Sequence, residues 1–170
     1  MEAPERAIEP LDKRRHQREG FSCESEALER YLKTQASQDV QKKVAAVFVL
    51  AEGRVVIGYY TLSSYTIDAG ELTEEVAKRL PSYPKLPAIL IGRLARDRNY
   101  ARQGLGELLL IDALRRSFKN TSEVGAAAIV VEAENEKARA FYVSYGFIPF
   151  PEHPNKLFLP MATIKRLLLQ

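Results

Sequence analysis

Cysteine and histidine are scarce in this sequence of 170 residues. The single cysteine, Cys23, has no partner for an internal disulfide, so the expected setting is a reducing compartment. The two histidines, His16 and His153, are far apart in the sequence, so no spacing typical of a zinc site exists. The sequence therefore predicts chemistry that needs no metal.

Long hydrophobic runs are also missing. The longest, residues 44–51, is far shorter than the roughly 20 residues that a membrane-spanning helix needs. The first residues include Glu2 and Glu5 and no apolar stretch of the kind found in signal peptides. We therefore expect a cytoplasmic protein that makes no contact with a membrane.

Neither sign of charge dominates the composition. Lys and Arg number 25 against 22 Asp and Glu, which gives a formal net charge of +3 and a pI of about 9.0. This small excess permits an anionic partner without identifying one. Hydrophobic residues make up 46% of the chain, enough for a sizeable core. We find no repeat or linker, so a single domain over residues 1–170 is expected.

Hydrophobic periodicity predicts alternating helices and strands. In chain order we expect a helix over 25–38, a hairpin of strands over 44–50 and 55–67, a short helix over 71–80, a strand over 88–95, a helix over 104–118, a strand over 126–132, a helix over 135–145, a strand over 157–159 and a helix over 161–169. The alternation in the second half is typical of an α/β fold.

Two segments are expected to lie outside the regular elements. Residues 1–20, which include a basic run over 13–18, are predicted to be a solvated entry segment, with a nucleic-acid-binding arm as the alternative. Pro81, Pro84 and Pro87 predict a stiff loop that ends where the strand over 88–95 begins.

The segment most informative about chemistry is residues 94–107, LARDRNYARQGLGE, in which a strand leads through a basic, glycine-bearing turn into a helix. Gly104 and Gly106 carry no side chains that would keep a ligand from the backbone. The N–H groups of the first helical turn, at the positive end of the helix dipole, favour an anion such as a pyrophosphate. A plain tight turn before a close-packed helix is the alternative.

A second motif follows the next expected strand. It reads N-x-x-A-x-x-F-Y-x-x-x-G-F, from Asn135 through Phe141 and Tyr142 to Phe147. Together the two motifs resemble those of the GNAT family of N-acetyltransferases, in which R/Q-x-x-G-x-G/A binds the pyrophosphate of acetyl-coenzyme A. The resemblance implies an α/β fold with a mixed sheet whose central parallel strands, here 88–95 and 126–132, splay apart.

The resemblance also implies which residues bind and react. Backbone groups of the strand end would contact the pantetheine and the thioester carbonyl, and the turn would hold the pyrophosphate. Coenzyme binding is thereby assigned to Leu94, Ala95, Arg96, Arg102, Gln103, Gly104, Leu105, Gly106, Glu107, Asn135 and Phe141. Acetyl-coenzyme A is the implied co-substrate.

Tyr142 matches the tyrosine that protonates the leaving thiolate in this family. A phenol has a reference pKa of about 10, so it is protonated at neutral pH and can act as a general acid. The structural alternative is a core aromatic residue beside Phe141. Asn135 has its own alternative as the N-cap of the following helix. Glu132 and Glu134 are expected to be solvated, and no general base is assigned.

Further segments resemble the branch of the family that contains toxins acetylating the α-amine of aminoacyl-tRNA. They are Phe21-x-Cys23, Ala27-Leu28-x-x-Tyr31-Leu32, Val56-x-Gly58-Tyr59-Tyr60-x-Leu62, Gly92-Arg93-Leu94-Ala95 and Leu157-Phe158-Leu159. This resemblance implies aminoacyl-tRNA and a ribbon-helix-helix antitoxin as partners, and homodimers are common in the family. The alternatives are an acetyltransferase for a small amine or a protein N-terminus, and a non-catalytic acetyl-coenzyme A-binding module.

The charge pattern is compatible with a tRNA substrate. Basic residues lie around the turn and on the helix after it, and they could contact a phosphate backbone: Arg93, Arg96, Arg98, Arg102, Arg115, Arg116 and Lys119. Arg93 stands out because an apolar strand rarely holds an unpaired arginine, so we expect it to face the substrate cleft. An α-amine, with a reference pKa of about 7.7–8.0, is partly neutral at pH 7 and needs little help from a base.

One position departs from the family motif, because Ala101 stands where an Arg or Gln is expected. Backbone N–H groups from Gln103 to Glu107 remain, and Arg102 can supply the missing charge from the next position. We therefore predict that Ala101→Arg leaves the affinity for acetyl-coenzyme A unchanged or raises it. Isothermal titration calorimetry measures this, and a marked loss of affinity would mean that the turn has been assigned to the wrong residues.

Overall fold

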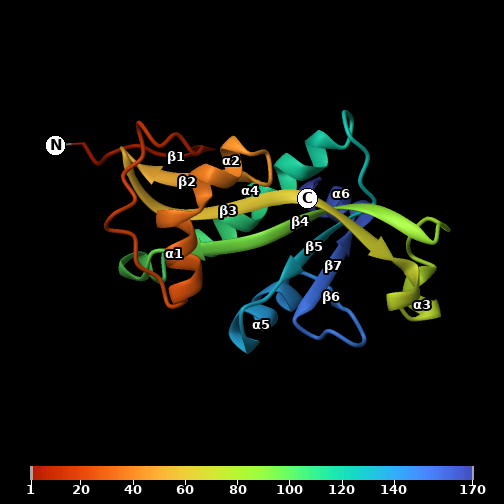
Figure 1. Ribbon diagram of the computed structural model, residues 1–170. Coiled ribbons are helices and arrows are strands. Elements are labelled where there is room, and N and C mark those ends of the chain that lie inside the picture. Colours follow the sequence, from red (N-terminus) through yellow and green to blue (C-terminus); the bar gives the residue numbers. More distant parts are fainter. Residues whose placement is uncertain (1, 170) are drawn as a thin grey trace. The chain divides into compact units, whose positions relative to one another are not determined.

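The computed structural model describes residues 2–169, which form an α/β fold (Figure 1). Seven strands make one mixed sheet in the order β1-β2-β3-β4-β5-β7-β6. The described chain divides into two compact units, residues 2–63 with Gly92–Ala113 and Ser64–Ile91 with residues 114–169. Within residues 2–169, no helix combines the length and apolar character required to cross a membrane.

The first unit contains the predicted hairpin. Strand β2 (Ala46–Glu52) pairs antiparallel with β3 (Val55–Asp68), and Val49 lies opposite Tyr59. Gly53, in the turn between them, has a φ of +63°, a left-handed conformation that favours glycine. The local sequence therefore determined both strands and the turn, as expected.

Most of residues 2–20 are exposed, as expected of a solvated segment, but the segment also contains a strand that the sequence did not predict. Strand β1 (Arg6–Pro10) pairs antiparallel with β2, and Ile8 lies opposite Leu50. His16 is buried, with Nε2 2.7 Å from Glu9 Oε1 and Nδ1 accepting a hydrogen bond from the Asp12 N–H at 2.9 Å. The edge of β2 supplies the partners for β1, and such a long-range pairing leaves little local signal in a short polar strand.

The helix expected over residues 25–38 is broken into two. Ser25 caps α1 (Glu26–Thr34) by accepting a hydrogen bond from the Leu28 N–H, as its position predicted. The helix ends at Gln35, and α2 (Ala36–Gln41) begins directly after it. Apolar periodicity continues across the break, so it could not reveal the interruption.

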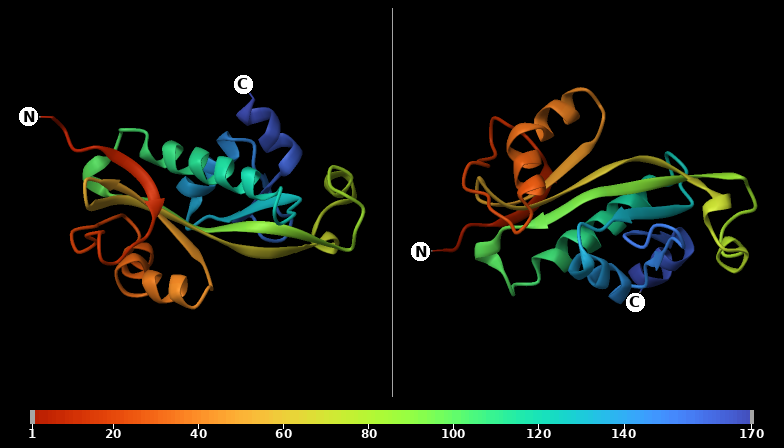
Figure 2. Two further views of the ribbon diagram at one scale, coloured as in Figure 1. Left: turned by 90° about the horizontal axis from the view of Figure 1, so that it is seen from above. Right: turned by 60° about the horizontal axis from the view of Figure 1, so that its bottom comes forward.

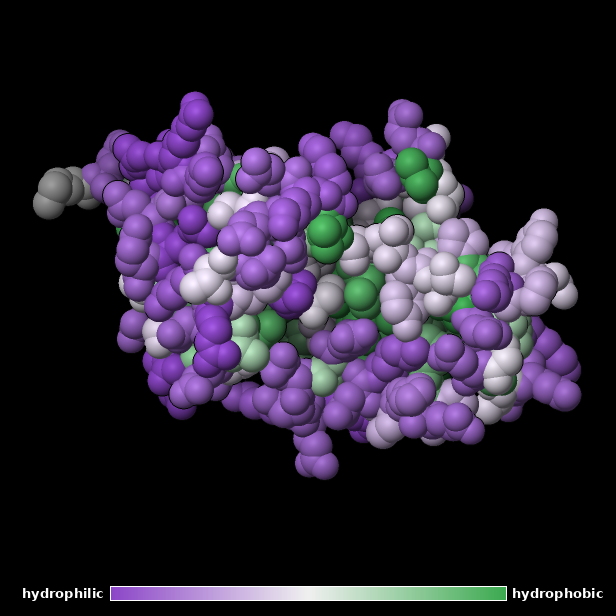
Figure 3. All heavy atoms as spheres, in the orientation of Figure 1, coloured by the Kyte–Doolittle hydropathy of each residue, from purple (hydrophilic) through white to green (hydrophobic). Residues whose placement is uncertain are grey.

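Helices cover both faces of the strands in the first unit. Figure 2 shows α1 and α2 on one face of the β1–β3 sheet and the first part of α4 (Leu105–Asn120) on the other. The core under α1 and α2 is built from buried residues of the helices and strands, which include Phe21, Tyr31, Leu32, Val47, Val49, Val56 and Tyr59. On the face seen in Figure 3, the side chains over the N-terminal elements are mainly hydrophilic.

The second unit contains the parallel pair of strands. Strand β4 (Lys85–Arg96) runs parallel to β5 (Ala128–Glu132), with Ala88 opposite Ala128. Strand β7 (Lys156–Pro160) pairs antiparallel with β5. β7 also pairs antiparallel with the short strand β6 (Ile148–Pro149), which the sequence did not predict.

The proline-rich segment differs from its prediction in two ways. Pro87 lies inside β4 rather than in a loop before it. It is exposed, and its carbonyl accepts a hydrogen bond from the Ala127 N–H at 2.8 Å. The helix expected over 71–80 shrinks to a 3₁₀ turn, η1 (Ala69–Glu71), and one α-helical turn, α3 (Glu74–Ala77).

The remaining helices match the sequence pattern closely. Helix α5 (Glu136–Ser144) is followed by Gly146 at a φ of +94°, which is the predicted stop signal. Helix α6 (Met161–Leu168) directly follows β7. The core of this unit joins buried residues from the strands and the proline-rich segment, which include Ile67, Leu80, Leu86, Ala128, Val130, Phe150 and Phe158.

A close approach at Gly58 offers a test of the packing in the first unit. A Cβ added there would lie 3.0 Å from Leu109 Cδ1 and 3.3 Å from the Ala95 carbonyl oxygen. We predict that Gly58→Ala lowers the free energy of unfolding by about 1–3 kcal/mol, because the backbone of β4 must shift to make room. Urea denaturation measures the change.

Gly20→Ala is the matched control, since no heavy atom lies within 4 Å of a Cβ added at Gly20. Its stability should stay the same or rise slightly, because alanine reduces the entropy of the unfolded chain. A loss of stability at both positions would contradict the packing argument.

Candidate functional site

The end of β4 contributes Leu94, Ala95 and Arg96 to the candidate site. In the parallel register, Ile91 lies opposite Val131, one residue before the end of β5, whereas β4 continues to Arg96. The final residues of β4 therefore extend past the last residue of its parallel neighbour. Ala95 is buried, and Leu94 and Arg96 are half-buried.

A buried carboxylate fixes the chain where it leaves β4. Asp97 caps the 3₁₀ turn η2 (Arg98–Tyr100) by accepting a hydrogen bond from the Asn99 N–H at 2.8 Å. Its other oxygen accepts a hydrogen bond from the Ser22 N–H at 3.1 Å. The sequence analysis missed Asp97, although an Asp two residues before an Asn is a recognisable turn signal.

The predicted anion-binding turn is present and its backbone groups are open. Arg102 and Gly104 adopt left-handed conformations, with φ of +64° and +72°. The Leu108 N–H makes a hydrogen bond to the Gly104 carbonyl at 3.1 Å, so the N–H groups of residues 105–107 precede the first intrahelical bond. Gly104 has no side chain to cap them, and no heavy atom lies within 4 Å of a Cβ added there.

These features fit the pyrophosphate of a coenzyme. The open N–H groups lie at the positive end of α4, where a phosphate is stabilised, and the exposed Arg102 adds a full positive charge next to them. A non-glycine residue in the left-handed region costs about 1–2 kcal/mol, so the conformation of Arg102 must be held by neighbouring contacts. The exposed Ala101 adds no polar group.

One of those contacts comes from a strand that the sequence did not predict. The Arg6 Nη2 of β1 donates a hydrogen bond to the Gln103 Oε1 at 2.9 Å. The side chain of Gln103, assigned to the coenzyme from the sequence, is thus directed towards β1. No local pattern links residues so far apart in the chain, so sequence reasoning alone had no signal for Arg6.

The second motif lies on α5, in the second unit. Asn135 accepts a hydrogen bond from the Ala138 N–H at 2.9 Å, so its predicted role as the helix N-cap is confirmed. Tyr142 is buried and makes edge contacts with Phe141 and Phe147, at centroid distances of 5.3 and 5.4 Å. Burial raises the pKa of the Tyr142 phenol, which keeps it protonated over the whole neutral range.

Three of the arginines that could have contacted a phosphate backbone have partners within the first unit. The Arg93 Cζ lies 3.5 Å from the centroid of the Tyr31 ring, which is a cation–π contact. The other two contacts are those of Arg96 with Glu24 at 3.5 Å and of Arg98 with the Cys23 carbonyl. Arg102 in the turn and Arg115 and Lys119 on α4 are exposed.

Arg93 is part of a polar network built around the buried side chains of Tyr31 and Asp39. The Tyr31 hydroxyl donates a hydrogen bond to Asp39 Oδ2 at 2.7 Å, and Gln35 donates one to Asp39 Oδ1 at 3.0 Å. Burial and the Asp39 contact raise the pKa of Tyr31 to about 12. The hydrogen bonds from Gln35 and Tyr31, and the charge of Arg93, lower the pKa of Asp39. The network joins α1, α2 and β4.

Residues 2–169 contain no group of three or more His, Cys, Asp or Glu side chains arranged to hold a metal ion.

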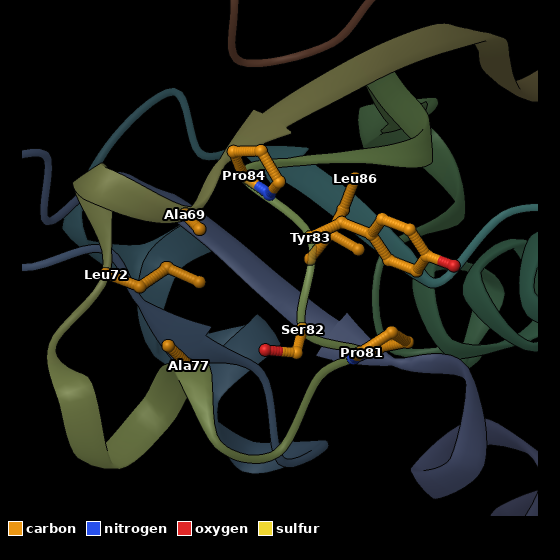
Figure 4. A pocket seen from close by; sticks show the side chains of 8 residues that line it. All are labelled: Ala69, Leu72, Ala77, Pro81, Ser82, Tyr83, Pro84 and Leu86. Atoms are coloured by element: carbon orange, nitrogen blue, oxygen red, sulfur yellow. The ribbon is translucent and has the colours of Figure 1, made fainter.

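A separate pocket of about 280 Å³ lies in the proline-rich segment of the second unit. Figure 4 shows its lining, which is mostly apolar and consists of Ala69, Leu72, Ala77, Pro81, Ser82, Tyr83, Pro84 and Leu86. None of the residues assigned to the candidate site lines this pocket.

An α/β fold with a mixed sheet, in which a glycine turn leads from a strand into a helix, is typical of acetyltransferases. The chain belongs to the Acetyltransferase (GNAT) family, whose model matches residues 12–147.

Two curated relatives cover most of the chain. It is 33% identical over 175 aligned residues to a protein of Sinorhizobium fredii described as "Probable toxin TacT". This alignment covers 98% of this chain and 97% of the relative. It is also 33% identical over 148 residues to the "tRNA-acetylating toxin" of Mycobacterium tuberculosis, covering 87% of this chain and 88% of the relative.

Solved structures of the toxin AtaT are similar over nearly the whole chain. AtaT complexed with acetyl-methionyl-tRNAfMet is 34% identical, with a TM-score of 0.86, and covers 96% of this chain and 99% of AtaT. A tyrosine-to-phenylalanine mutant of AtaT, bound to acetyl-CoA and to the C-terminus of the antitoxin AtaR, is 32% identical with a TM-score of 0.84. It covers 98% of this chain and 99% of that chain.

The Asp39 network predicts a specific dependence of stability on pH. Because the folded protein holds the pKa of Asp39 below its unfolded value of about 3.9, the ionised carboxylate stabilises the fold at pH 7. That contribution is lost as the pH falls below about 5. We predict that Asp39→Asn is less stable than the wild type at pH 7 and that the difference shrinks at about pH 3.5.

Urea denaturation at both pH values measures the difference. Tyr31→Phe is the matched variant, because it keeps the ring beneath Arg93 and removes one hydrogen bond to Asp39. In the Tyr31→Phe background the effect of Asp39→Asn should be smaller. An equal difference at the two pH values would show that Asp39 does not stabilise the fold through its charge.

Proposed function

We propose that this chain is an acetyl-CoA-dependent N-acetyltransferase that acetylates the α-amine of aminoacyl-tRNA and acts as a toxin by blocking translation. The observation that carries the proposal is the open turn at the start of α4, where uncapped N–H groups and Arg102 provide a site for a pyrophosphate. Similarity to the tRNA-acetylating toxins, at 33–34% identity, supports aminoacyl-tRNA as the acceptor.

Acetyl-CoA supplies an acetyl group activated as a thioester. The N–H groups of residues 105–107 would bind its pyrophosphate, with Arg102 and Gln103 at the edge of the turn. Backbone groups of Leu94, Ala95 and Arg96 would pair with the pantetheine and donate to the thioester carbonyl, a contact that strengthens as charge develops on the oxygen. We further assign Asn135 and Phe141 of α5 to the coenzyme.

Tyr142 is proposed as the general acid. The neutral α-amine attacks the carbonyl carbon, the C–S bond breaks, and the phenol donates its proton to the departing thiolate while the amine loses a proton to solvent. Because burial raises the pKa of Tyr142, the phenol is protonated at neutral pH and still carries the proton when the thiolate departs. Because the acceptor amine has a reference pKa of about 7.7–8.0, a fraction of it is neutral at pH 7 without a protein base.

The proposed partners follow from the same similarity. Exposed Arg102, Arg115 and Lys119 are available to tRNA phosphates, and the antitoxin would be of the ribbon-helix-helix type.

We also propose that the two compact units form a single catalytic domain and that two copies can form a homodimer. The enzyme would act in the cytoplasm, where its tRNA substrate is found.

The proposal predicts transfer of labelled acetyl from acetyl-CoA to charged tRNA and not to deacylated tRNA. We expect Tyr142→Phe to lower kcat by about 100-fold or more while binding of acetyl-CoA persists, because the variant keeps the ring and loses the proton. The rate should rise with pH up to about 8 as the α-amine loses its proton. Filter-bound label measures transfer, and calorimetry measures binding.

Tyr145→Phe is the control, since Tyr145 directly follows α5 and contacts the same Phe141 ring at 5.1 Å. Polyamines and a peptide mixture serve as competing acceptors. Label on these amines and none on charged tRNA would exclude the toxin function. Full activity of Tyr142→Phe would exclude Tyr142 as the acid.

A further inference from the structure

Arg6 joins strand β1 to the turn that precedes α4. Its Nη2 donates to the Gln103 Oε1 at 2.9 Å, and its Nε donates to the Glu52 Oε2 at 2.7 Å. The same guanidinium lies over the Tyr100 ring, 5.7 Å from the centroid. A single side chain thus contacts the turn at two residues and the end of β2 at a third.

Glu52 is the second anchor of this arrangement. It lies directly opposite Arg6 in the antiparallel pairing of β1 and β2. Its Oε1 accepts a hydrogen bond from the Tyr100 hydroxyl at 3.3 Å. Burial and the Glu52 carboxylate raise the pKa of Tyr100, so this hydroxyl stays protonated and remains a donor. Glu52 therefore ties η2 to the sheet, and Arg6 balances its charge.

We propose that Arg6 is a positioning residue for coenzyme binding, which holds the turn over residues 100–104 in its open conformation through Gln103 and Glu52. The proposal rests on the proposed function, in which this turn binds the pyrophosphate. Arg6 precedes residues 12–147, the part of the chain that matches the family model, so the family motif does not include it.

Two features of the turn explain why it depends on such support. Arg102 has a left-handed backbone conformation, and Ala101 lacks the side chain that the family motif places there. Without Arg6, the Glu52 carboxylate would also repel an anion at the turn. Arg6 therefore acts through geometry and through charge, and both effects concern only the pyrophosphate end of the coenzyme.

Two acetyl donors separate this role from a general effect on the fold. Acetyl-CoA carries the pyrophosphate, and acetyl-pantetheine lacks it. We expect Arg6→Ala to raise the KM for acetyl-CoA roughly fivefold with little change in kcat, as the loss of a partly exposed ion pair would produce. The kcat/KM for acetyl-pantetheine should stay unchanged, because that donor does not reach the turn.

Arg15→Ala is the matched control. Arg15, which follows β1 in the chain, forms an ion pair with Glu9 of β1 at 3.1 Å, and it has no contact with the turn over residues 100–104 among its hydrogen bonds in the described chain. This variant should keep the wild-type KM for both donors. Thermal unfolding of the two variants checks that the fold is equally stable in each.

The outcomes distinguish the positioning role from the function itself. An unchanged KM for acetyl-CoA in Arg6→Ala, or an equal loss with both donors, would overturn the positioning role and leave the acetyltransferase function standing. If the wild-type protein binds no acetyl-CoA by calorimetry, the proposed function fails, and the role of Arg6 fails with it.

Discussion

The uncapped N-terminus of α4 is the constraint on which the candidate site depends. A helix normally satisfies its first N–H groups with a Ser, Thr, Asp or Asn side chain at the N-cap. Here Gly104 occupies that position, so the N–H groups of residues 105–107 remain available to a ligand. The same glycine provides the left-handed φ that turns the chain from β4 into α4. An anion at this place satisfies groups that the fold leaves open.

The rest of the first unit keeps this turn in place. Asp97 fixes the exit from β4 by accepting hydrogen bonds from the N–H groups of Ser22 and Asn99. The contacts of Glu52 with Tyr100 and Arg6 secure its middle. Apart from the local bond between Asp97 and Asn99, these bonds join residues from different parts of the chain, so this support for the turn exists only in the folded protein. Preorganised donors of this kind bind an anion without losing flexibility in the process.

Several of the basic residues near the turn stabilise the folded structure. The basic residues near the turn looked like a surface for nucleic acid, yet Arg93 lies against Tyr31 and Arg98 donates to the Cys23 carbonyl. These guanidinium groups hold loops and helices onto β4. Arg102, Arg115 and Lys119 are exposed, and the proposed attraction for tRNA would rest on groups such as these.

The sequence by itself determined the features that arise from neighbouring residues. The turn at Gly104, the Asn135 cap and the stop at Gly146 each depend on φ values and hydrogen bonds within a few positions, so their residue types predict them. Gln103, one of the partners of Arg6, lies 97 positions away from it in the sequence. Only the tertiary structure decided such contacts, because a long, flexible arginine can pair with any acceptor that the folded backbone brings within its reach.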